Sequence, residues 1–332
     1  SALRECRGGS ERCIRVSGVD SKLYFSYLEL ADSEFENGLL LPDHYPQFYT
    51  PRNIEAICEF IADKKINVIL DYSHVITGDT RRYYLEIRKR NPGIKIFTMI
   101  HNCPSHTTQL KQYELSTLRF KDVRGAKQFF QWMLPQLYIN LLKRVVSHQN
   151  RSAYDTLDEV VLLSPAYIPE FRKLIGKKDA RRLSAIPNAI QPVHSVIPIE
   201  QKDKEIIFVG RMATETALPR LLKIWEMIQD KLPDWKLTLV GDGPRFDTCR
   251  QIIREKELKR VRLTGHQMSI PYIDRARIIC LTSVIEGLPT VFTEAMSLGV
   301  IPIGFDSFNA IYDMIDDGVD GFIIPDNNYE QY

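Results

Sequence analysis

The chain has 332 residues, enough for two domains with sizeable cores, because a domain usually has about 100–200 residues. Hydrophobic residues make up 44% and charged residues 26% of it, which excludes disordered, collagen-like and low-complexity proteins. No apolar run approaches the ~18 residues of a membrane-spanning helix, and no secretory pattern opens the sequence. The six cysteines are scattered without a CxxC pair, so they indicate neither a disulfide framework nor a zinc site. These features predict a cytoplasmic protein.

The net charge of +2 hides an asymmetry between the two halves of the chain. Residues 1–198 contain 28 Lys and Arg against 21 Asp and Glu, whereas residues 199–332 contain 16 against 21. The basic excess is concentrated in residues 101–182, with 14 basic and 7 acidic side chains. A basic region is typical of an anionic partner, such as a lipid surface or a phosphorylated substrate, and equally of an ordinary solvated face. The sequence leaves both open.

Short apolar runs alternate with helical patterns along the whole chain. The pattern predicts strands over 22–27, 67–70, 94–100, 160–163, 206–209, 237–240, 261–263, 278–281 and 301–303. Helices are predicted over 52–64, 218–231 and 289–298. Several strands are continuous β-branched runs, which is typical of strands buried on both faces. The alternation indicates an α/β fold with parallel sheets.

A change of composition predicts the boundary between two domains. Pro187 and Pro192 interrupt the chain, and a polar stretch over 200–204 leads into the next strand. We therefore expect an N-terminal domain over 1–195 and a C-terminal domain over 196–332. Two Rossmann-like domains facing each other across a cleft would place a ligand at the carboxyl ends of their strands.

Three predicted strands of the second half end in a glycine or polar turn. The first is followed by Gly210 and Arg211, the second by residues 241–244, and the third by residues 282–290. A single such glycine can serve only tight backbone geometry. Three of them in one domain indicate a ligand site at the carboxyl edge of the sheet.

The third turn leads into a helix that is predicted to begin at Pro289. The backbone amides of Leu288, Thr290 and Val291 would then point outward at the positive end of the helix dipole, which is a typical phosphate site.

Two glutamates belong to this segment. Glu286 precedes the helix and can accept hydrogen bonds in the cleft, while Glu294 follows eight residues later on the second turn. Taken by itself, Glu294 is most simply an exposed helical glutamate.

The segment from Glu286 to Glu294 resembles the E-x7-E signature of retaining glycosyltransferases of the GT-B fold, in particular glycosyltransferase family 4 (group 1 glycosyltransferases). Its neighbours resemble further motifs of that family. These are VGR(L/M) at 209–212, VGDGP at 240–244, DGxxG at 317–321, and landmarks of the first half at 100–102, 164 and 186–188.

The resemblance implies a hexosyltransferase that moves a sugar from a nucleoside-diphosphate sugar (a UDP-sugar or GDP-sugar) to an acceptor hydroxyl with retention. The N-terminal domain would hold a saccharide or lipid-linked acceptor, and the C-terminal domain the donor. Polysaccharide or glycolipid biosynthesis would be the setting. The family needs no bound metal or other cofactor, and no motif for nucleic-acid binding occurs.

The family's catalytic residues fall on His101, Arg211 and Glu286, with Arg211 pairing with the diphosphate and Glu286 binding the donor sugar. Glu294 would bind the ribose hydroxyls. The full set expected to bind the donor is Glu294, Gly210, Gly287, Leu288, Thr290, Val291, His266, Gly8 and Gly9.

One departure from the family concerns a lysine that usually follows the VGR arginine by five or six residues. Residues 212–217 contain none, and Arg220 and Lys223 are predicted to lie inside the next helix, away from the diphosphate. Both ends of the sequence also resemble shortened versions of the family pattern. A catalytically weak or inactive relative that binds a nucleotide sugar without turnover is therefore the alternative.

The segment 128–144 is apolar and aromatic and ends in Lys143 and Arg144. The commoner interpretation is a buried core helix that Pro135 would kink. The alternative is a helix lying on a membrane surface, where it would receive a lipid-linked acceptor.

Overall fold

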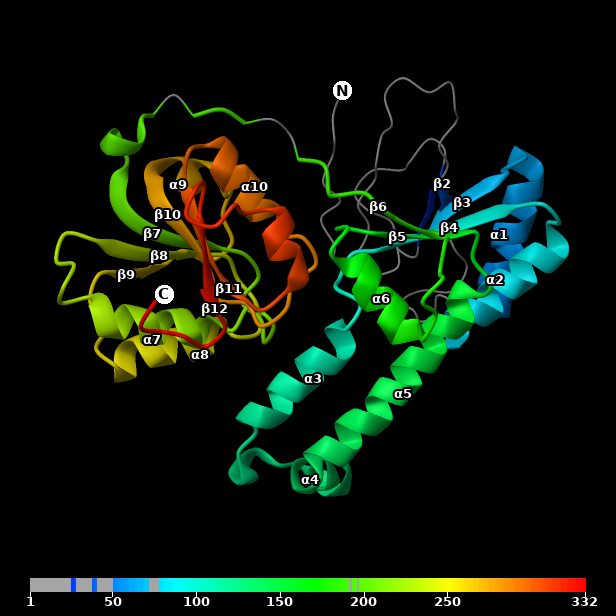
Figure 1. The fold of residues 1–332 in the computed structure, drawn as a ribbon, viewed down its shortest axis with the longest axis horizontal. Helices are drawn as coiled ribbons and strands as arrows, with labels where there is room; N and C mark the ends of the chain where they lie inside the picture. The colour runs from blue at the N-terminus through cyan, green and yellow to red at the C-terminus, as the bar shows by residue number, and fades with distance from the viewer. Residues whose placement is uncertain (1–24, 28–37, 41–49, 72–77, 191–192, 196) are drawn as a thin grey trace. The chain divides into compact units, whose positions relative to one another are not determined.

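The computed structural model describes residues 25–27, 38–40, 50–71, 78–190, 193–195 and 197–332 (Figure 1). The chain divides into two compact units. The first comprises the described parts of Ser1–Met99 together with His148–Val161, and the second comprises Ile100–Ser147 and the described parts of Leu162–Tyr332. The domain boundary predicted at 195/196 stays a prediction.

The first unit begins with two short parallel strands, followed by alternating helices and strands. Its elements are β1 (Phe25–Tyr27), β2 (Gly38–Leu40), α1 (Pro51–Lys64), β3 (Val68–Asp71), α2 (Gly78–Arg90) and β4 (Lys95–Ile100), and β5 (Glu159–Leu162) closes it. Helix α1 begins after Thr50, whose side chain accepts a hydrogen bond from the amide of Asn53 at 3.1 Å. It buries Ile54, Ile57 and Ile61 at helical spacing.

Asp158 fixes the turn that precedes β5. Its carboxylate accepts hydrogen bonds from the amide of Ile96 at 2.8 Å and from Nζ of Lys95 at 3.1 Å, and it also pairs with the guanidinium of Arg88. The strands β3 and β4 run parallel, and the sheet continues in the order β3-β4-β5-β6.

The second unit contains a helical segment and a second α/β layer. The helical segment consists of α3 (His106–Thr117), the short 3₁₀ turn η1 (Phe120–Asp122), α4 (Gly125–Met133) and α5 (Pro135–Tyr154); the residues of α5 from His148 onward belong to the first unit. The rest comprises α6 (Tyr167–Ile175), β6 (Leu183–Ala185), η2 (Ile199–Gln201), β7 (Asp203–Val209), α7 (Leu218–Ile228), β8 (Lys236–Val240), α8 (Phe246–Glu255), β9 (Val261–Leu263), α9 (Ile270–Arg275), β10 (Ala276–Leu281), α10 (Thr290–Ser297), β11 (Ile301–Asp306), η3 (Asn309–Asp313) and β12 (Phe322–Pro325).

The strands of the C-terminal region form a parallel sheet in the order β12-β11-β10-β7-β8-β9. Helices α7 and α8 lie on one face, and α9 and α10 lie on the other (Figure 1). The chain proceeds outward from β7 through β8 to β9, then returns to β10 beside β7 and proceeds the other way. The direction therefore reverses between β7 and β10, and ligands of open α/β sheets bind at the carboxyl ends of the strands at such a point.

Large apolar side chains fill both faces of this sheet. Phe208, Trp225, Leu239, Phe292 and Phe305 are fully or almost fully buried. Burying each contributes about 1.5–3 kcal/mol, so the sheet and its helices are held mainly by apolar contacts.

The sequence located most strands to within a few residues, but not all of them. Each predicted strand overlaps an observed one, although residues 22–24 lie outside the described part of the chain. Strands β2, β6 and β12 were not predicted; β6, for example, has three residues whose sequence, Leu-Ser-Ala, carries no β-branched run. The predicted helix 218–231 ends earlier, at Ile228.

The interpretation of 128–144 as a buried core helix is wrong. The segment forms two helices, with Pro135 as the first residue of the second rather than as a kink. Few of its apolar side chains are buried, Ile139 among them, and most large ones, such as Phe130 and Leu137, are 36–53% exposed. None of the described helices is long and apolar enough to cross a bilayer.

Two glycine turns at the carboxyl edge approach each other backbone to backbone. The amide of Gly210 donates to the carbonyl of Val240 at 3.0 Å, and the amide of Met212 donates to the carbonyl of Asp242 at 2.8 Å. A Cβ atom on Gly241, where φ is +137°, would lie 1.9 Å from the carbonyl oxygen of Gly210. Only glycine fits there, because the neighbouring atom is backbone and cannot move aside.

We expect Gly241→Ala to lower the free energy of unfolding by about 2–4 kcal/mol, through the steric conflict with Gly210 and the positive φ. Gly176→Ala is the matched control, because Gly176 also has a positive φ, of +66°, but no atom lies within 4 Å of its added Cβ. The control should cost only about 1–2 kcal/mol. Urea denaturation measures both, and equal losses would contradict the close approach.

Candidate functional site

The turns that follow β7 and β10 lie at the point where the strand order reverses. The turn after β7 carries Gly210 and Arg211, and the loop after β10 runs through Ser283 and Glu286 to helix α10. The two strands are paired directly, with Ile278 opposite Ile206. The fold therefore brings together, at one edge, two of the three turns that the sequence singled out.

Glu286 is a partly buried carboxyl group at this edge. Its Oε1 atom accepts a hydrogen bond from the hydroxyl of Ser283 at 2.7 Å. Burial raises the pKa of Glu286 to about 7, against the lowering effect of the Ser283 hydrogen bond and with a smaller contribution from the negative charge of Glu215. Near neutral pH this carboxyl group can therefore both donate and accept hydrogen bonds.

Gly287 lies against the residue that follows β4. A Cβ atom on Gly287 would come within 2.0 Å of the carbonyl oxygen of His101 and 3.2 Å of a side-chain carbon of Leu163. Glycine is required because the chain of the first half passes this close. The structure thus brings His101, Gly287 and Glu286 together, as the sequence predicted for a common site, although their roles stay predictions.

Tyr167 supports the backbone of the loop that carries Glu286, and this role was not predicted from the sequence. Its hydroxyl oxygen lies 2.9 Å from the carbonyl of Glu286 and 2.7 Å from the carbonyl of Gly287, and the side chain is fully buried. Burial raises the pKa of Tyr167, so the hydroxyl stays a hydrogen-bond donor. The sequence carried no signal for this contact, because a tyrosine at the start of an apolar helix is indistinguishable from a core residue.

Further polar contacts fix helix α6 against the C-terminal region. The hydroxyl of Ser164, a residue that the sequence also singled out, pairs with the carboxylate of Asp313, which also accepts from the amide of Ala166 at 3.2 Å. One carboxylate oxygen of Glu170 accepts from the side chain of Asn309 at 2.7 Å. These contacts hold the segment that carries Tyr167.

Helix α10 begins at Thr290, one residue later than predicted, and Pro289 occupies the cap position. The amides of Thr290 and Val291 belong to its first turn, where helix amides have no acceptor within the helix. Leu288 precedes them, and its carbonyl accepts from the side chain of Asn188 at 3.4 Å. Glu294 lies on the second turn and is half-buried, so it is not the fully exposed helical glutamate of the simplest interpretation.

Arg211 and His266 are exposed and lie on neighbouring turns. The amide of Gly241 donates to the carbonyl of Gly265 at 2.9 Å, while Gly210 packs on the other side of Gly241. The turns at Gly210, Gly241 and Gly265 therefore contact one another through their backbones, with Arg211 beside the first and His266 beside the last. Both side chains are free to meet an anionic ligand.

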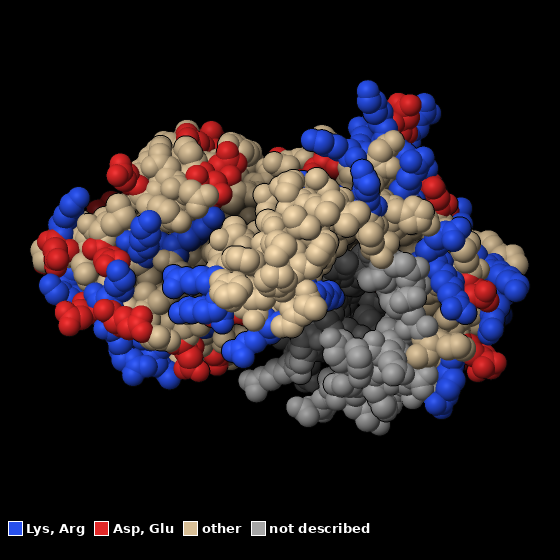
Figure 2. Space-filling model, turned by 90° about the horizontal axis from the view of Figure 1, so that it is seen from below, with Lys and Arg blue, Asp and Glu red and all other residues tan. Residues whose placement is uncertain are grey.

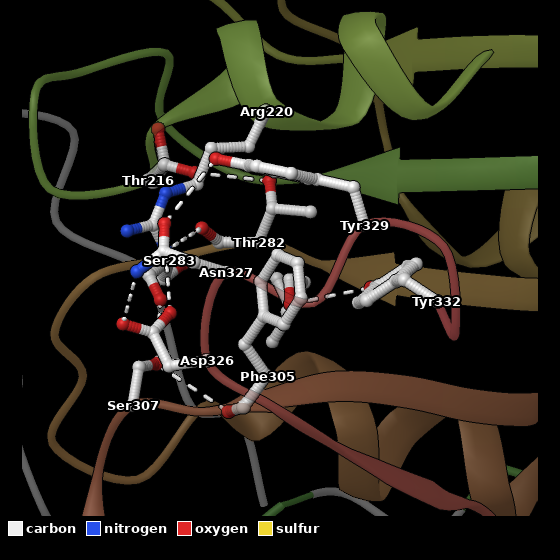
Figure 3. Close-up of polar contacts among 11 residues, drawn as sticks. Thr216, Arg220, Thr282, Ser283, Phe305, Ser307, Asp326, Asn327, Tyr329 and Tyr332 are labelled. Carbon is white, nitrogen blue, oxygen red and sulfur yellow. Dashed lines mark hydrogen bonds and ion pairs between the residues drawn. The ribbon is translucent and has the colours of Figure 1, made fainter. Parts of the chain in front are cut away.

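Arg220, in the first turn of α7, is a buried cation that pairs with a half-exposed carboxylate, Asp326 (Figure 3). Its Nη1 atom lies 2.9 Å from Oδ1 of Asp326 and 3.5 Å from the carbonyl of Thr282, and its side chain is only 9% exposed. The guanidinium also lies over the ring of Phe305, 5.6 Å from its centre. Arg220 thus links Thr282, which follows β10, to Asp326, which follows β12.

Hydroxyl groups extend this network along the strand ends (Figure 3). Ser307 donates to the carbonyl of Ser283 at 2.6 Å, and Thr282 donates to the carbonyl of Thr216 at 3.5 Å. The hydroxyl of Tyr332 lies 2.8 Å from the carbonyl of Ile303 and 3.3 Å from the carbonyl of Leu281, the last residue of β10. The start of the loop that carries Glu286 is therefore fixed from three neighbouring segments.

The position of the family's lysine is occupied by Thr216 or Ala217, both of which are buried. Ala217 has a positive φ of +47° and immediately precedes α7. Arg220 and Lys223 lie inside α7, as predicted, and Lys223 contacts the ring of Tyr329, 4.4 Å from its centre. Gly8 and Gly9 lie outside the described residues. Among the described residues, no three His, Cys, Asp or Glu side chains are grouped as for a metal ion.

Comparison with known proteins identifies this region. Residues 190–332 match the family of glycosyl transferases group 1. The C-terminal region therefore resembles a group 1 glycosyltransferase domain.

Individual relatives agree with this assignment. An uncharacterized glycosyltransferase of Haemophilus influenzae is 26% identical over 181 residues, which cover 54% of this chain and 50% of that protein. The lipopolysaccharide 1,6-galactosyltransferase of Salmonella typhimurium is 28% identical over 150 residues, covering 43% of this chain and 42% of that one. The chain thus spans about half the length of the curated relatives it matches.

Solved structures show that the fold is the GT-B fold of glycosyltransferases. The crystal structure of HepE from Anabaena in complex with UDP superposes with a TM-score of 0.60 at 15% identity, covering 84% of this chain and 69% of that one. Sucrose-phosphate synthase from Thermosynechococcus elongatus gives 0.63 at 15% identity, covering 88% and 71%.

The raised pKa of Glu286 predicts how stability depends on pH. Between the ordinary value near 4.5 and the folded value of about 7, the folded state binds more protons than the unfolded state. The free energy of unfolding should therefore fall as the pH rises from about 5 to 8, by at most about 3 kcal/mol from this residue.

Glu286→Gln should remove this part of the pH dependence, which urea denaturation across that range would measure. Glu330→Gln, at an exposed position near the end of the chain, is the control. Parallel profiles for wild type and Glu286→Gln would contradict a raised pKa.

Proposed function

We propose that the protein is a retaining glycosyltransferase that moves a sugar from a nucleoside-diphosphate sugar to an acceptor hydroxyl. The observation that carries this proposal is the position of Arg211 and Glu286 in the turn and loop that follow β7 and β10, where the sheet order reverses, with Glu294 on the helix that follows. A cation, the first turn of a helix and two carboxyl groups are what a diphosphate joined to two sugars requires.

Different residues of the site bind different parts of the donor. The Arg211 guanidinium and the amides of Leu288, Thr290 and Val291 bind the diphosphate, because a planar guanidinium and helix amides match phosphate oxygens. Glu294 accepts the two ribose hydroxyls.

The turns around Gly210 and His266 frame the nucleotide, and the reacting sugar lies beside Glu286, Gly287 and His101. Because the neutral form of the Glu286 carboxyl is populated near pH 7, it can donate to one sugar oxygen and accept from a hydroxyl.

The reaction breaks the bond between the anomeric carbon and the diphosphate oxygen and forms a bond from that carbon to the acceptor oxygen. The acceptor hydroxyl proton passes to the departing diphosphate on the same face, so the configuration is retained. No nucleophilic side chain is needed. The protein contributes by placing the acceptor and by stabilising negative charge on the leaving group.

Polysaccharide or glycolipid biosynthesis at the cytoplasmic side of a membrane is the proposed setting. Support comes from relatives named for such pathways, among them the galactosyltransferase of lipopolysaccharide synthesis. The acceptor is proposed to be a saccharide or a lipid-linked saccharide. We propose that neither a metal nor another cofactor takes part, since Arg211 and helix α10 supply the positive charge.

The donor site predicts a specific nucleotide response. A nucleoside diphosphate present at 100 times its dissociation constant should raise the free energy of unfolding by about 2.7 kcal/mol. Thermal shifts with UDP, GDP and ADP would identify the base. Glu294→Ala should abolish the shift, whereas Glu255→Ala, on an exposed position of α8, should preserve it. A full shift with Glu294→Ala would place the ribose elsewhere.

Turnover separates an active enzyme from the alternative, a relative that binds the donor without transfer, which the absent lysine makes worth testing. With the sugar donor of the nucleotide that raises the unfolding temperature, NMR of the product should show the same anomeric configuration as in the donor. Arg211→Met should lower kcat/KM about 10–100-fold, the value of a charge-assisted hydrogen bond, while Arg254→Met should not. Inverted product would contradict retention, and binding without product would establish the alternative.

A further inference from the structure

An aromatic cluster lies on the surface of the helical segment formed by η1, α4 and α5. Phe120 is 65%, Phe129 40% and Trp132 36% exposed. Their rings contact one another, with centroids 5.2 Å apart for Phe120 and Trp132 and 6.2 Å apart for Phe129 and Trp132. The hollow beside them is lined by Phe120, Lys121, Val123, Gly125, Ala126 and Phe129. Soluble proteins rarely expose so many large apolar side chains together unless something covers them.

Helix α5 continues the apolar surface along one face. Leu137, Leu141 and Val145 follow one another at four-residue spacing and are 45–51% exposed. Met133 and Leu134, at the junction of α4 and α5, are 53% and 42% exposed and connect the stripe to the aromatic cluster. We call the exposed apolar residues of 120–145 the apolar tip.

Basic side chains surround the apolar tip. Between residues 119 and 145 there are six exposed basic residues and one acidic residue, Asp122. The basic ones are Arg119, Lys121, Arg124, Lys127, Lys143 and Arg144. Figure 2 views the molecule from the side of α4, and the uncharged surface there is bordered by Lys and Arg.

We infer that the apolar tip is a docking surface for an anionic lipid bilayer. Phe, Trp, Leu and Met insert at the boundary between headgroups and acyl chains, while Lys and Arg stay at the level of the phosphates. A second copy of this chain fits less well, because a symmetric contact would place two like-charged rims against each other. The attachment is peripheral, since no described helix could span the membrane.

This inference concerns a surface distinct from the residues that form the candidate donor site. It would bring the protein to the layer in which a lipid-linked acceptor resides. Vesicle binding needs no turnover, so its failure would leave the proposed sugar transfer untouched, and the failure of transfer would leave vesicle binding untouched.

Co-sedimentation with vesicles tests the surface directly. The full chain should bind vesicles of equal parts phosphatidylcholine and phosphatidylglycerol, bind pure phosphatidylcholine at least tenfold more weakly, and dissociate as salt rises from about 0.05 to 0.5 M. The apolar variant Phe120→Ser/Phe129→Ser/Trp132→Ser should lose binding. Its circular dichroism should match wild type because these side chains are exposed.

A charge variant provides a second test that leaves the apolar side chains in place. Lys121→Glu/Arg124→Glu/Lys127→Glu should weaken binding by at least about tenfold, since each basic residue near an anionic surface contributes roughly fivefold. The control Lys178→Glu/Lys231→Glu/Arg254→Glu changes the net charge equally at exposed positions elsewhere and should keep most of the binding. Equal losses in both variants would indicate non-specific attraction and overturn the proposal.

Trp132 reports insertion itself. Lipids brominated in their acyl chains should quench the fluorescence of wild type far more than that of Trp132→Phe. Of the other two tryptophans, Trp225 is buried at 1% exposure, and Trp235 is half-buried in the turn between α7 and β8, outside the apolar tip. Failure to bind either vesicle would overturn the proposal. So would binding without Trp132-dependent quenching, or a dimer by light scattering that the apolar variant converts to a monomer.

Discussion

The candidate site depends on a buried positive charge. Arg220 is nearly inaccessible to water and lies among apolar residues, so its guanidinium needs an anionic partner, which Asp326 supplies from 106 residues further along the chain. The Asp326 carboxylate is 37% exposed, so the roughly 3–5 kcal/mol lost when a fully buried pair is broken is an upper bound for removing it. The pair therefore fixes where the ends of β10 and β12 lie, more than it adds net stability.

The ion pair helps to fix the position of the loop that carries Glu286. It starts at Ser283, which is held by Ser307 and lies next to Thr282, whose carbonyl faces Arg220. It ends where Tyr167 supports the backbone of Glu286 and Gly287. With both ends fixed, the carboxyl group of Glu286 is held where burial raises its pKa, instead of rotating into water. A site that binds sugar hydroxyls benefits from such a preorganised group, because little entropy is lost on binding.

The N-terminal half of the chain is net basic and the C-terminal part is net acidic, and this separation of charge agrees with the proposed donor site and the proposed membrane surface. The C-terminal residues 199–332 are net acidic, but the edge at the strand reversal presents Arg211 and the start of helix α10. Much of the basic excess lies in the helical segment, where residues 119–145 carry six basic side chains and one acidic side chain around the apolar tip. In the two proposals these positive surfaces serve different anions: a compact diphosphate in one case and an extended layer of lipid phosphates in the other.

The sequence by itself determined the α/β class, most of the strands and the residues of the E-x7-E segment. It could do so because hydrophobic period, turn glycines and the spacing of Glu286 and Glu294 are local features. The contact of Gly287 with His101, the support from Tyr167 and the pair of Arg220 with Asp326 join residues about a hundred or more positions apart. Only the tertiary structure decided these. It also decided that the apolar residues of 128–144 face outward, because an apolar helical pattern is the same whether a core or a bilayer covers it.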